Sequence, residues 1–437
     1  MAKGERGFKA VCCWKVDTAG SWIVGVNNPL SNGAPAMSYQ QLTLEEREVI
    51  SQMHYSGSGP TAIARRLDRS PPEVLQALVL RKLRQDTIDR LGECDDVVVT
   101  VPAYFNEPRR KATQDAGQMA GLNVLDIINE PTAAAIAYGV GQGFVSTDGR
   151  AEADETIMVY DLGGGTFDVS IMRIEGNAYT VLATDGNVQL GGIDFDRCLA
   201  TKIVEEFVAR HGVDPRDDPG AEQRLYREAE EAKRGLSARE KLTVILEVAG
   251  QGVRVPVSRG DFEVMTAHLL ERTRFTMTNL LKTAQLTWDD ITRLLLVGGS
   301  TRMPMVTSML EQESGKTIDR SLAADEAVAH GAAIYAGLLR QHGAIVQKNM
   351  IVTNVCSHSL GVLGVETATG RKKNRVMIAA NTPLPASKAA AFKTYKDDQS
   401  TVAVNVIEGE MRLGITRHQL ASVSCEACRP DCRRRLK

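Results

Sequence analysis

The sequence lacks the features that mark several protein classes. It has no apolar run of about 18 residues, so no transmembrane helix is expected. Residues 1–7 are not followed by an apolar stretch, so no signal peptide is expected. The formal net charge is −2, with no excess of one sign that would favour nucleic acid or a membrane surface. Eight cysteines spread over the chain do not form a dense disulfide framework, which favours a reducing compartment, the cytoplasm.

The rest of the composition is that of an ordinary globular protein. The chain has 437 residues, of which 43% are hydrophobic and 24% charged. This length predicts about three domains with sizeable cores. Residues 96–105 and 125–131 have the pattern of buried strands, and residues 107–120 and 132–138 have that of helices. Alternating strands and helices predict an α/β layer architecture.

A glycine-rich hairpin stands out at residues 161–168. Apolar residues before it and alternating apolar residues after it predict two strands, 156–160 and 169–174. Three consecutive glycines favour a turn whose free N–H groups can hold an anion. Asp161 can hold Mg²⁺ through its water shell, and Thr166 adds a hydroxyl donor. The stretch therefore predicts a phosphate site with a metal carboxylate beside it, and the alternative is a hairpin without a ligand.

Residues 41–69 have a different character. Thr43 and Glu46 form a capping-box pattern at the start of a helix, residues 56–60 break it, and residues 61–67 form a second helix. The pair resembles the opening of the helix-turn-helix of some insertion-sequence transposases, which would place the next helix in a DNA groove. That next helix, residues 72–83, is so apolar that packing into a core is favoured. Nucleic acid is therefore not the expected partner.

Four motifs resemble the seventy-kilodalton heat-shock chaperones of the DnaK type. They are the hairpin and the segments Val99–Phe105 (VTVPAYF), Ile128–Gly139 (INEPTAAAIAYG) and Leu295–Pro304 (LLVGGSTRMP). The resemblance covers about residues 70–410 and implies an α/β, actin-like ATPase with two ribonuclease H-like lobes that close on ATP or ADP with Mg²⁺. It also implies that the first lobe is incomplete and that a partial β-sandwich follows, so that the family domain is truncated at both ends.

The resemblance divides the chain into five parts. Residues 1–69 would be an unrelated segment with the candidate helix-turn-helix at 41–69, followed by an incomplete nucleotide-binding domain (70–345), an interdomain linker (346–354), the first strands of a peptide-binding sandwich (355–410) and a basic, cysteine-containing tail (411–437). The tail is expected to be disordered. Alternatively, Cys425, Cys428 and Cys432, with His418, could start a zinc site.

The resemblance also implies roles for individual residues. Glu130, Asp161 and Thr166 would be catalytic: Glu130 would orient the attacking water or the metal shell, and Asp161 would hold Mg²⁺ through water. For Glu130 the alternative is a carboxylate at a helix start, and for Asp168 a hydrogen-bond acceptor within the hairpin. ATP would be bound by Gly163, Gly164, Gly165, Thr166, Gly192, Glu230, Lys233, Arg234, Ser237, Gly298, Gly299, Ser300, Arg302 and Asp325.

One part of the family pattern is missing before Ser70. The family's first phosphate loop, a strand followed by Asp-Leu-Gly-Thr-Thr, has no counterpart there, and neither has the catalytic lysine that follows that loop. Removing one preorganised group of this kind costs about 10²–10³ in rate. Whether the chain hydrolyses ATP is therefore open at the level of the sequence.

The expected function is that of a chaperone that binds unfolded polypeptide under the control of ATP. The resemblance implies a heat-shock protein with J-domain and nucleotide-exchange co-chaperones as partners and a role in stress responses. One alternative is a degenerate scaffold that does not hydrolyse ATP, because the first phosphate loop is missing. The other is a DNA-binding fusion, because of residues 41–69.

Overall fold

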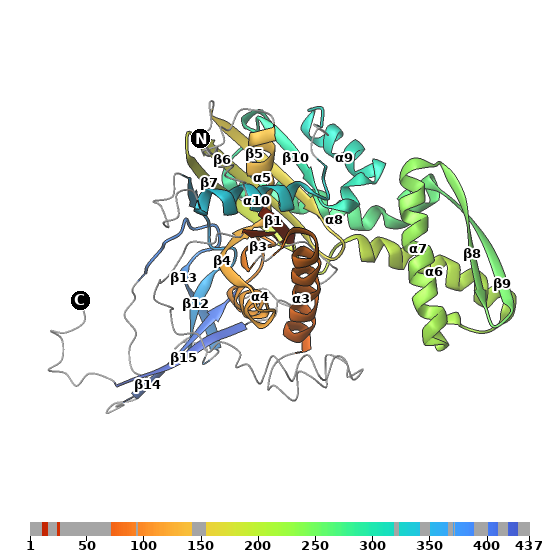
Figure 1. The fold of residues 1–437 in the computed structure, drawn as a ribbon, viewed down its shortest axis with the longest axis horizontal. Helices are drawn as coiled ribbons and strands as arrows, with labels where there is room; N and C mark the ends of the chain where they lie inside the picture. The colour runs from red at the N-terminus through yellow and green to blue at the C-terminus, as the bar shows by residue number, and fades with distance from the viewer. Residues whose placement is uncertain are drawn as a thin grey trace, which may run out of the picture.

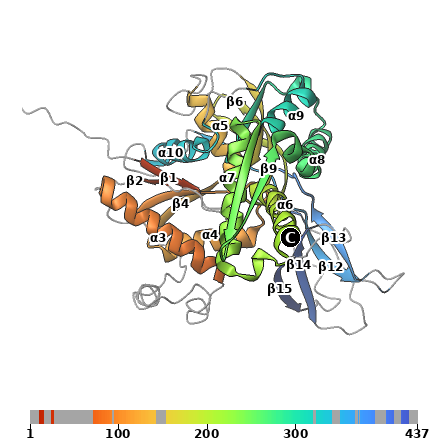
Figure 2. The same cartoon turned by 90° about the vertical axis from the view of Figure 1, so that its right-hand side faces the viewer.

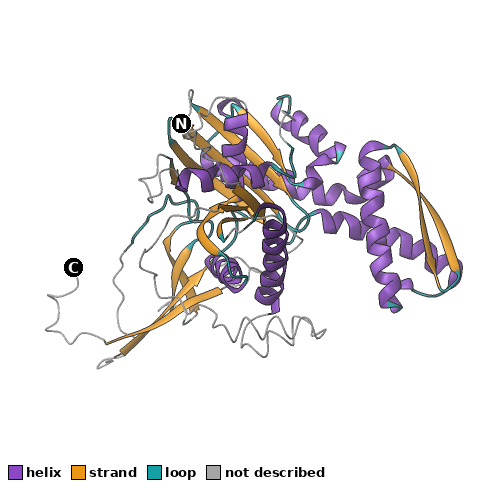
Figure 3. Ribbon diagram, in the orientation of Figure 1, coloured by secondary structure: helices purple, strands orange, loops and turns teal. Residues whose placement is uncertain are grey.

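The computed structural model describes residues 11–15, 24–26, 71–92, 95–141, 154–318, 323–340, 350–365, 370, 372–388, 401–409 and 418–426. Its elements form two separate helix-covered sheets, an arm of helices and strands, and a C-terminal sheet (Figures 1 and 3). No helix in these ranges is long and apolar enough to cross a bilayer. The predicted helix-turn-helix at 41–69 lies outside the described residues.

The first sheet is covered on one face by two helices that follow the pattern predicted from the sequence. Its elements are α3 (Pro71–Leu91), β3 (Asp96–Val101), α4 (Glu107–Met119) and β4 (Asn123–Asn129). Strands β3 and β4 pair in parallel. Val97 and Val99 of β3 pack against α3 and α4, whereas Val98 faces the opposite side, as the alternation of strand side chains requires. The apolar side of α3 is therefore part of a core, as expected.

Part of the N-terminal segment joins this sheet. Strand β1 (Val11–Lys15) runs parallel to the end of β3, with Trp14 opposite Val99. Strand β2 (Val24–Val26) runs antiparallel both to β1 and to the beginning of β3. Two short segments from residues 1–69 thus supply backbone partners for the edge of β3.

The second sheet carries the glycine hairpin and has the strand order β10-β5-β6-β7-β11. Its strands are β5 (Glu155–Leu162), β6 (Phe167–Glu175), β7 (Ala178–Asn187), β10 (Arg293–Val297) and β11 (Ile351–Thr353). The predicted hairpin is confirmed, because β5 and β6 pair antiparallel up to Leu162 opposite Phe167. Strand β11, within the expected interdomain linker, pairs parallel with β7 at the sheet edge.

Two helices lie between the sheets. Helix α5 (Glu130–Gly141) and helix α10 (Ala327–Arg340) share one core with Val98 of the first sheet and with Ile157 and Val159 of β5. They cross very closely, because a Cβ at Gly331 would lie 1.6 Å from the carbonyl oxygen of Ala133. Met158, Tyr160 and Leu162 of β5 face a separate core on the opposite side of the sheet.

That separate core joins the sheet to an arm, which Figures 1 and 2 show on one side of the molecule. The arm and its base consist of α6 (Gly192–His211), α7 (Pro219–Ala238), the hairpin β8 (Lys241–Val248) and β9 (Gln251–Ser258), α8 (Arg259–Ala284) and α9 (Pro304–Ser314). Three short 3-10 turns accompany them at Pro215–Asp217, Trp288–Asp290 and Gly299–Arg302. Helices α6, α7 and α8 pack side by side through buried apolar residues such as Phe195, Leu225 and Phe262.

Several boundaries differ from the sequence prediction. Strand β3 ends at Val101 because Pro102, which has no N–H, cannot continue the ladder. Helix α6 begins at Gly192, where the Asp194 carboxylate accepts the Gly191 N–H at 2.9 Å and caps the helix. Helix α5 likewise begins at Glu130, directly after β4.

The C-terminal residues form a four-stranded sheet in the order β13-β12-β14-β15. The strands are β12 (Leu360–Val365), β13 (Lys372–Ile378), β14 (Thr401–Glu408) and β15 (His418–Glu426). The predicted disorder of residues 411–437 is wrong for β15, which pairs antiparallel with β14. The tail of a chain is readily ordered when it pairs with an exposed strand edge. Cys428 and Cys432 of the zinc alternative lie outside the described residues.

Candidate functional site

The tip of the β5–β6 hairpin presents backbone donors. The Gly163 N–H donates to the Thr166 carbonyl at 2.9 Å and closes the turn. Within the described part of the chain, the N–H groups of Gly164 and Gly165 donate to no backbone carbonyl. Adjacent N–H groups at a turn of this kind can hold an anion.

The start of α6 docks directly on this tip. Gly192 N–H donates to the Gly163 carbonyl at 2.9 Å, and Ile193 N–H donates to the Gly164 carbonyl at 2.8 Å. A Cβ on Gly191 would lie 2.5 Å from the Gly165 nitrogen, so the two loops approach too closely for a side chain. The N-terminus of a helix carries a partial positive charge, which adds to the anion-binding character of the hairpin.

A third loop lies against the hairpin because β10 runs parallel to β5, with Val297 opposite Asp161. The next residue, Gly298, has φ +88°, and a Cβ there would lie 2.4 Å from the Leu162 carbonyl oxygen and 2.7 Å from Asp161 Oδ1. Only glycine fits this position. Ser300 Oγ donates to the Gly163 carbonyl at 3.0 Å, so the loop is joined to the hairpin by its side chain as well.

Helix α7 contributes a buried cation. Lys233 Nζ donates to the Gly192 carbonyl at 3.0 Å and to an Asp196 carboxylate oxygen at 2.9 Å. Both side chains are buried. Burial raises the pKa of Asp196 above its usual 3.8, although the Lys233 ammonium acts in the opposite direction. Sequence reasoning missed Asp196, because its partner lies on another helix and no local spacing links them.

The other residues that the sequence predicts to bind ATP on α7 and near Arg302 take different positions. Glu230 and Arg234 are exposed on α7, and the Ser237 hydroxyl donates to the Lys233 carbonyl at 3.3 Å. Arg302 Nη2 donates to Asp325 Oδ1 at 2.6 Å in an exposed ion pair. That hydrogen bond holds the pKa of Asp325 below its usual value.

Like Lys233 and Ser300, the polar residues Glu130, Asp161, Thr166 and Asp168, which were predicted or weighed as part of the site, are buried. Asp161 lies beside Gly298, because a Cβ on that glycine would lie 2.7 Å from Asp161 Oδ1. Asp168 lies opposite Asp161 in the hairpin register, and a Cβ on Gly186 would lie 2.3 Å from its Oδ1. Glu130 occupies the first position of α5, whose body packs on β5.

The donor set fits a magnesium–polyphosphate group. The hairpin tip offers two backbone N–H donors. The side chains of Thr166, Lys233 and Asp161 add a hydroxyl, an ammonium and a carboxylate. Glycines at 191, 192 and 298 leave the loop backbones free of Cβ atoms where they meet. Hard oxygen ligands and waters are the coordination that Mg²⁺ prefers.

Comparison with known proteins agrees with this chemistry. A family model described as "Hsp70 protein" matches residues 38–435. The chain is 41% identical over 384 residues to "Chaperone protein dnaK3" of Thermosynechococcus vestitus, covering 86% of this chain and 54% of that protein. It is 42% identical over 343 residues to "Heat shock 70 kDa protein BIP3" of Oryza sativa subsp. japonica, covering 78% and 50%. The chain therefore spans about half the length of these relatives.

Proposed function

The chain belongs to the Hsp70 family, and from this premise we propose that it binds ATP and ADP with Mg²⁺ at the glycine hairpin and acts as a chaperone. In this proposal, nucleotide controls the binding of unfolded or extended polypeptide, with J-domain and nucleotide-exchange proteins as co-chaperones. The names of the two relatives, a chaperone and a heat-shock protein, support the assignment of this chain as a chaperone. The cysteine pattern supports the cytoplasm as its location.

One observation carries the nucleotide proposal. The Gly163 carbonyl accepts hydrogen bonds from both the Gly192 N–H and the Ser300 hydroxyl, so one atom of the hairpin joins the two loops that surround it. These bonds link segments that are far apart in the sequence. A site whose donors are already held in place loses little free energy to reorganisation when an anion enters.

The residues would divide the nucleotide between them. Gly163, Gly164, Gly165 and Thr166 would hold the phosphates, with Gly192 in the adjoining loop. Glu230, Lys233, Arg234 and Ser237 on α7 would bind the nucleoside, opposite Gly298, Gly299, Ser300, Arg302 and Asp325. Mg²⁺ supplies positive charge to the phosphates when bound, and Asp161 would hold its water shell. Glu130 would orient the attacking water.

The polypeptide-binding part of the proposal is supported by the C-terminal sheet. Strands β12, β13, β14 and β15 form an antiparallel sheet. A sheet of this kind can take up an extended peptide along an edge through main-chain hydrogen bonds. Residues shortly before β12 contact the elements of the first sheet: Ser357 Oγ donates to the Phe105 carbonyl at 3.2 Å, and Asn129 Nδ2 donates to Asn354 Oδ1 at 3.1 Å.

A second candidate function is a nucleotide-binding scaffold that does not hydrolyse ATP. The absence of the first phosphate-loop sequence and of its lysine before Ser70 favours it. Each such group is worth about 10²–10³ in rate, so losing both would lower turnover by about 10⁴–10⁶ if the effects add, while leaving the hairpin donors in place. Binding and turnover therefore have to be measured separately.

Titration calorimetry with Mg-ADP and Mg-ATP on the full chain tests the binding proposal. We expect saturable heat for both nucleotides, with affinity about 10–100-fold weaker in Asp161→Asn because an outer ligand of the metal is lost. Asp289→Asn, at an exposed position on a distant turn, is the matched control and should bind as the unchanged chain does. No heat at millimolar nucleotide would refute the proposal. Phosphate release under the same conditions then separates the chaperone ATPase from the scaffold.

A further inference from the structure

A groove separate from the nucleotide residues lies between α8 and α9. Its volume is about 460 Å³, and none of the site residues discussed above lines it. Leu270 of α8 and Met305 and Met309 of α9 supply its apolar lining. Methionine side chains are unbranched and polarizable, and they adapt to partners of different shape.

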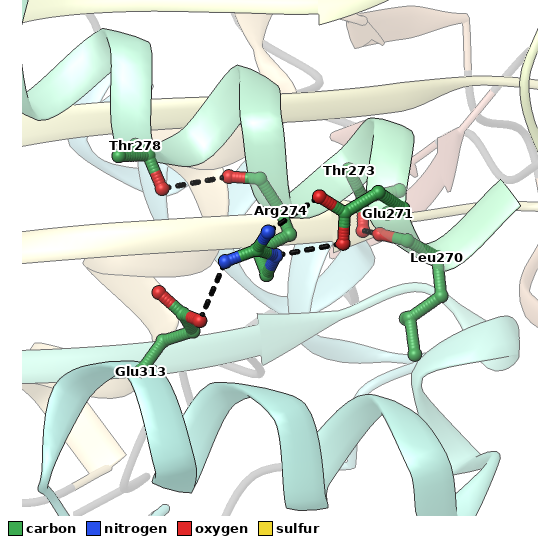
Figure 4. A network of polar contacts seen from close by, with 6 residues as sticks. All are labelled: Leu270, Glu271, Thr273, Arg274, Thr278 and Glu313. Carbon is green, nitrogen blue, oxygen red and sulfur yellow. Dashed lines mark hydrogen bonds and ion pairs between the residues drawn. The ribbon is translucent and has the colours of Figure 1, made fainter. Parts of the chain in front are cut away.

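The walls of the groove are acidic. Glu263 and Glu271 of α8 and Glu313 of α9 line it together with a single basic residue, Arg274, which leaves two negative charges in excess. Figure 4 shows the Arg274 side chain extending from α8 to Glu313 on α9. Arg274 Nη1 donates to Glu313 at 2.9 Å and its Nε donates to Glu271 at 2.8 Å. Among the described residues, Glu263 forms no ion pair.

Two stripes on α8 border this groove. Glu263, Leu270 and Arg274, at helical spacings of seven and four, face into it. One position beyond Glu263 and Arg274 lie Val264 and Phe275, an outer stripe whose side chains are 79% and 66% exposed. A single exposed apolar residue is ordinary, but here two large ones flank an apolar groove with acidic walls.

We propose that the α8–α9 groove is a docking site for a cationic amphipathic helix of a partner protein. The lining of α8 from Glu263 to Arg274 is about 16 Å long at 1.5 Å per residue, which matches about three turns of a docked helix. Apolar side chains of the partner at positions i, i+3 or i+4 and i+7 pack on Leu270, Met305 and Met309. Its lysines or arginines pair with Glu263 and compete with Arg274 for Glu313.

The charge pattern is what selects this occupant. An acidic or neutral helix would leave Glu263 without a counter-charge beside an apolar surface, and it would gain nothing from Glu313. Helix α9 carries no basic residue, so no cation of that helix offsets the negative charge of Glu313 on its side of the groove. A cation next to an apolar side chain therefore meets a complementary surface over the whole length of the groove.

The test uses the full chain labelled with ¹³C at its methionine methyl groups and a synthetic 14-residue helix built only from leucine and lysine. We expect the Met305 and Met309 resonances, identified from Met305→Leu and Met309→Leu, to shift saturably with the peptide. The matched leucine–glutamate helix should leave them unchanged. Shifts confined to other methionines would place the peptide elsewhere, including the C-terminal sheet, and would overturn the proposal, as would the absence of any shift.

Two charge-reversal variants, one in the groove lining and one outside it, test whether the binding is specific. Glu263→Lys should weaken the peptide's effect on Met305 and Met309 on the order of tenfold, because an attraction becomes a repulsion. Glu311→Lys makes the same change in net charge on α9 but outside the lining, and should leave the affinity nearly unchanged. Equal weakening by both variants would mean non-specific attraction and would overturn the proposal. Shifts of these two resonances with protein concentration alone would identify a second copy as the occupant and overturn it too.

Discussion

Replacing Lys233 by methionine should destabilise the arm far more than replacing its partner Asp196 by asparagine. The two side chains form a buried ion pair with Nζ 2.9 Å from a carboxylate oxygen. Burial raises the pKa of Asp196 despite the adjacent ammonium, so folding disfavours the charged form of this carboxyl group relative to its neutral form. Asparagine resembles that neutral form and keeps an oxygen that accepts from Lys233.

The magnitudes follow from what each change leaves behind. Lys233→Met leaves a buried carboxylate without a cation and the Gly192 carbonyl without its donor, a loss of about 3–5 kcal/mol in the free energy of unfolding. Asp196→Asn leaves a hydrogen-bonded pair, and we expect a loss of about 1 kcal/mol. Both variants keep the length of the side chain within one or two atoms, so cavity effects are small.

The pH dependence gives an independent check. Without Lys233, the pKa of Asp196 in the folded state lies further above its unfolded value of 3.8. A folded-state pKa raised in this way adds stability at low pH, and that stability is lost as pH rises through the folded pKa. The deficit of Lys233→Met relative to the unchanged chain should therefore be full at about pH 8 and shrink toward about pH 5.

Urea unfolding followed by circular dichroism at both pH values measures these differences. The double variant Asp196→Asn/Lys233→Met should be more stable than Lys233→Met alone, because the buried charge is gone. If Asp196→Asn costs as much as Lys233→Met, or if the deficit does not change with pH, then burial does not dominate the energetics of this pair. Either result would refute this prediction.

Three further changes have clear expected outcomes. Gly331→Ala should destabilise the chain by about 1–3 kcal/mol or more in urea unfolding, because a Cβ there overlaps a backbone carbonyl of α5. The control Gly337→Ala, on the same helix, places its Cβ in open space and should stabilise the chain by about 0.5–1 kcal/mol. Gly298→Ala should weaken nucleotide binding in calorimetry through strain at φ +88°, whereas Gly299→Ala, which meets no atom, should not; equal effects would contradict the proposed packing of this loop. Tyr160→Phe removes a 2.7 Å hydrogen bond to a buried hydroxyl of α8 and should cost about 0.5–1.5 kcal/mol, and no change would show that this bond contributes nothing net.

Local patterns predicted most of the elements near the site. The run of apolar residues before Asp161 and the alternation after Thr166 predicted β5 and β6, and both strands are present. The helix predicted for residues 107–120 is α4, which begins at Glu107 because the Asn106 side chain caps it. These features depend on neighbours within a few residues, so the sequence pattern contains them directly.

Long-range pairing was much less predictable. Strands β1 and β2 pair with β3, and β11 pairs with β7. No local sequence pattern specifies these pairings. Strand β15 was expected to be disordered because its residues resemble no family motif, yet it pairs with β14 along its whole length. Backbone hydrogen bonds do not depend on side-chain identity, so composition alone does not reveal such partners.

The glycine hairpin depends both on the local sequence pattern and on the tertiary structure. The sequence by itself determined that residues 161–168 form a tight turn with free donors, because three glycines between two strand patterns allow few other conformations. Only the tertiary structure decided that this turn is enclosed. Gly192 reaches it from the start of α6, and Ser300 reaches it across 137 positions of sequence because β10 lies parallel to β5. Sheet topology sets that contact, and no local pattern encodes it.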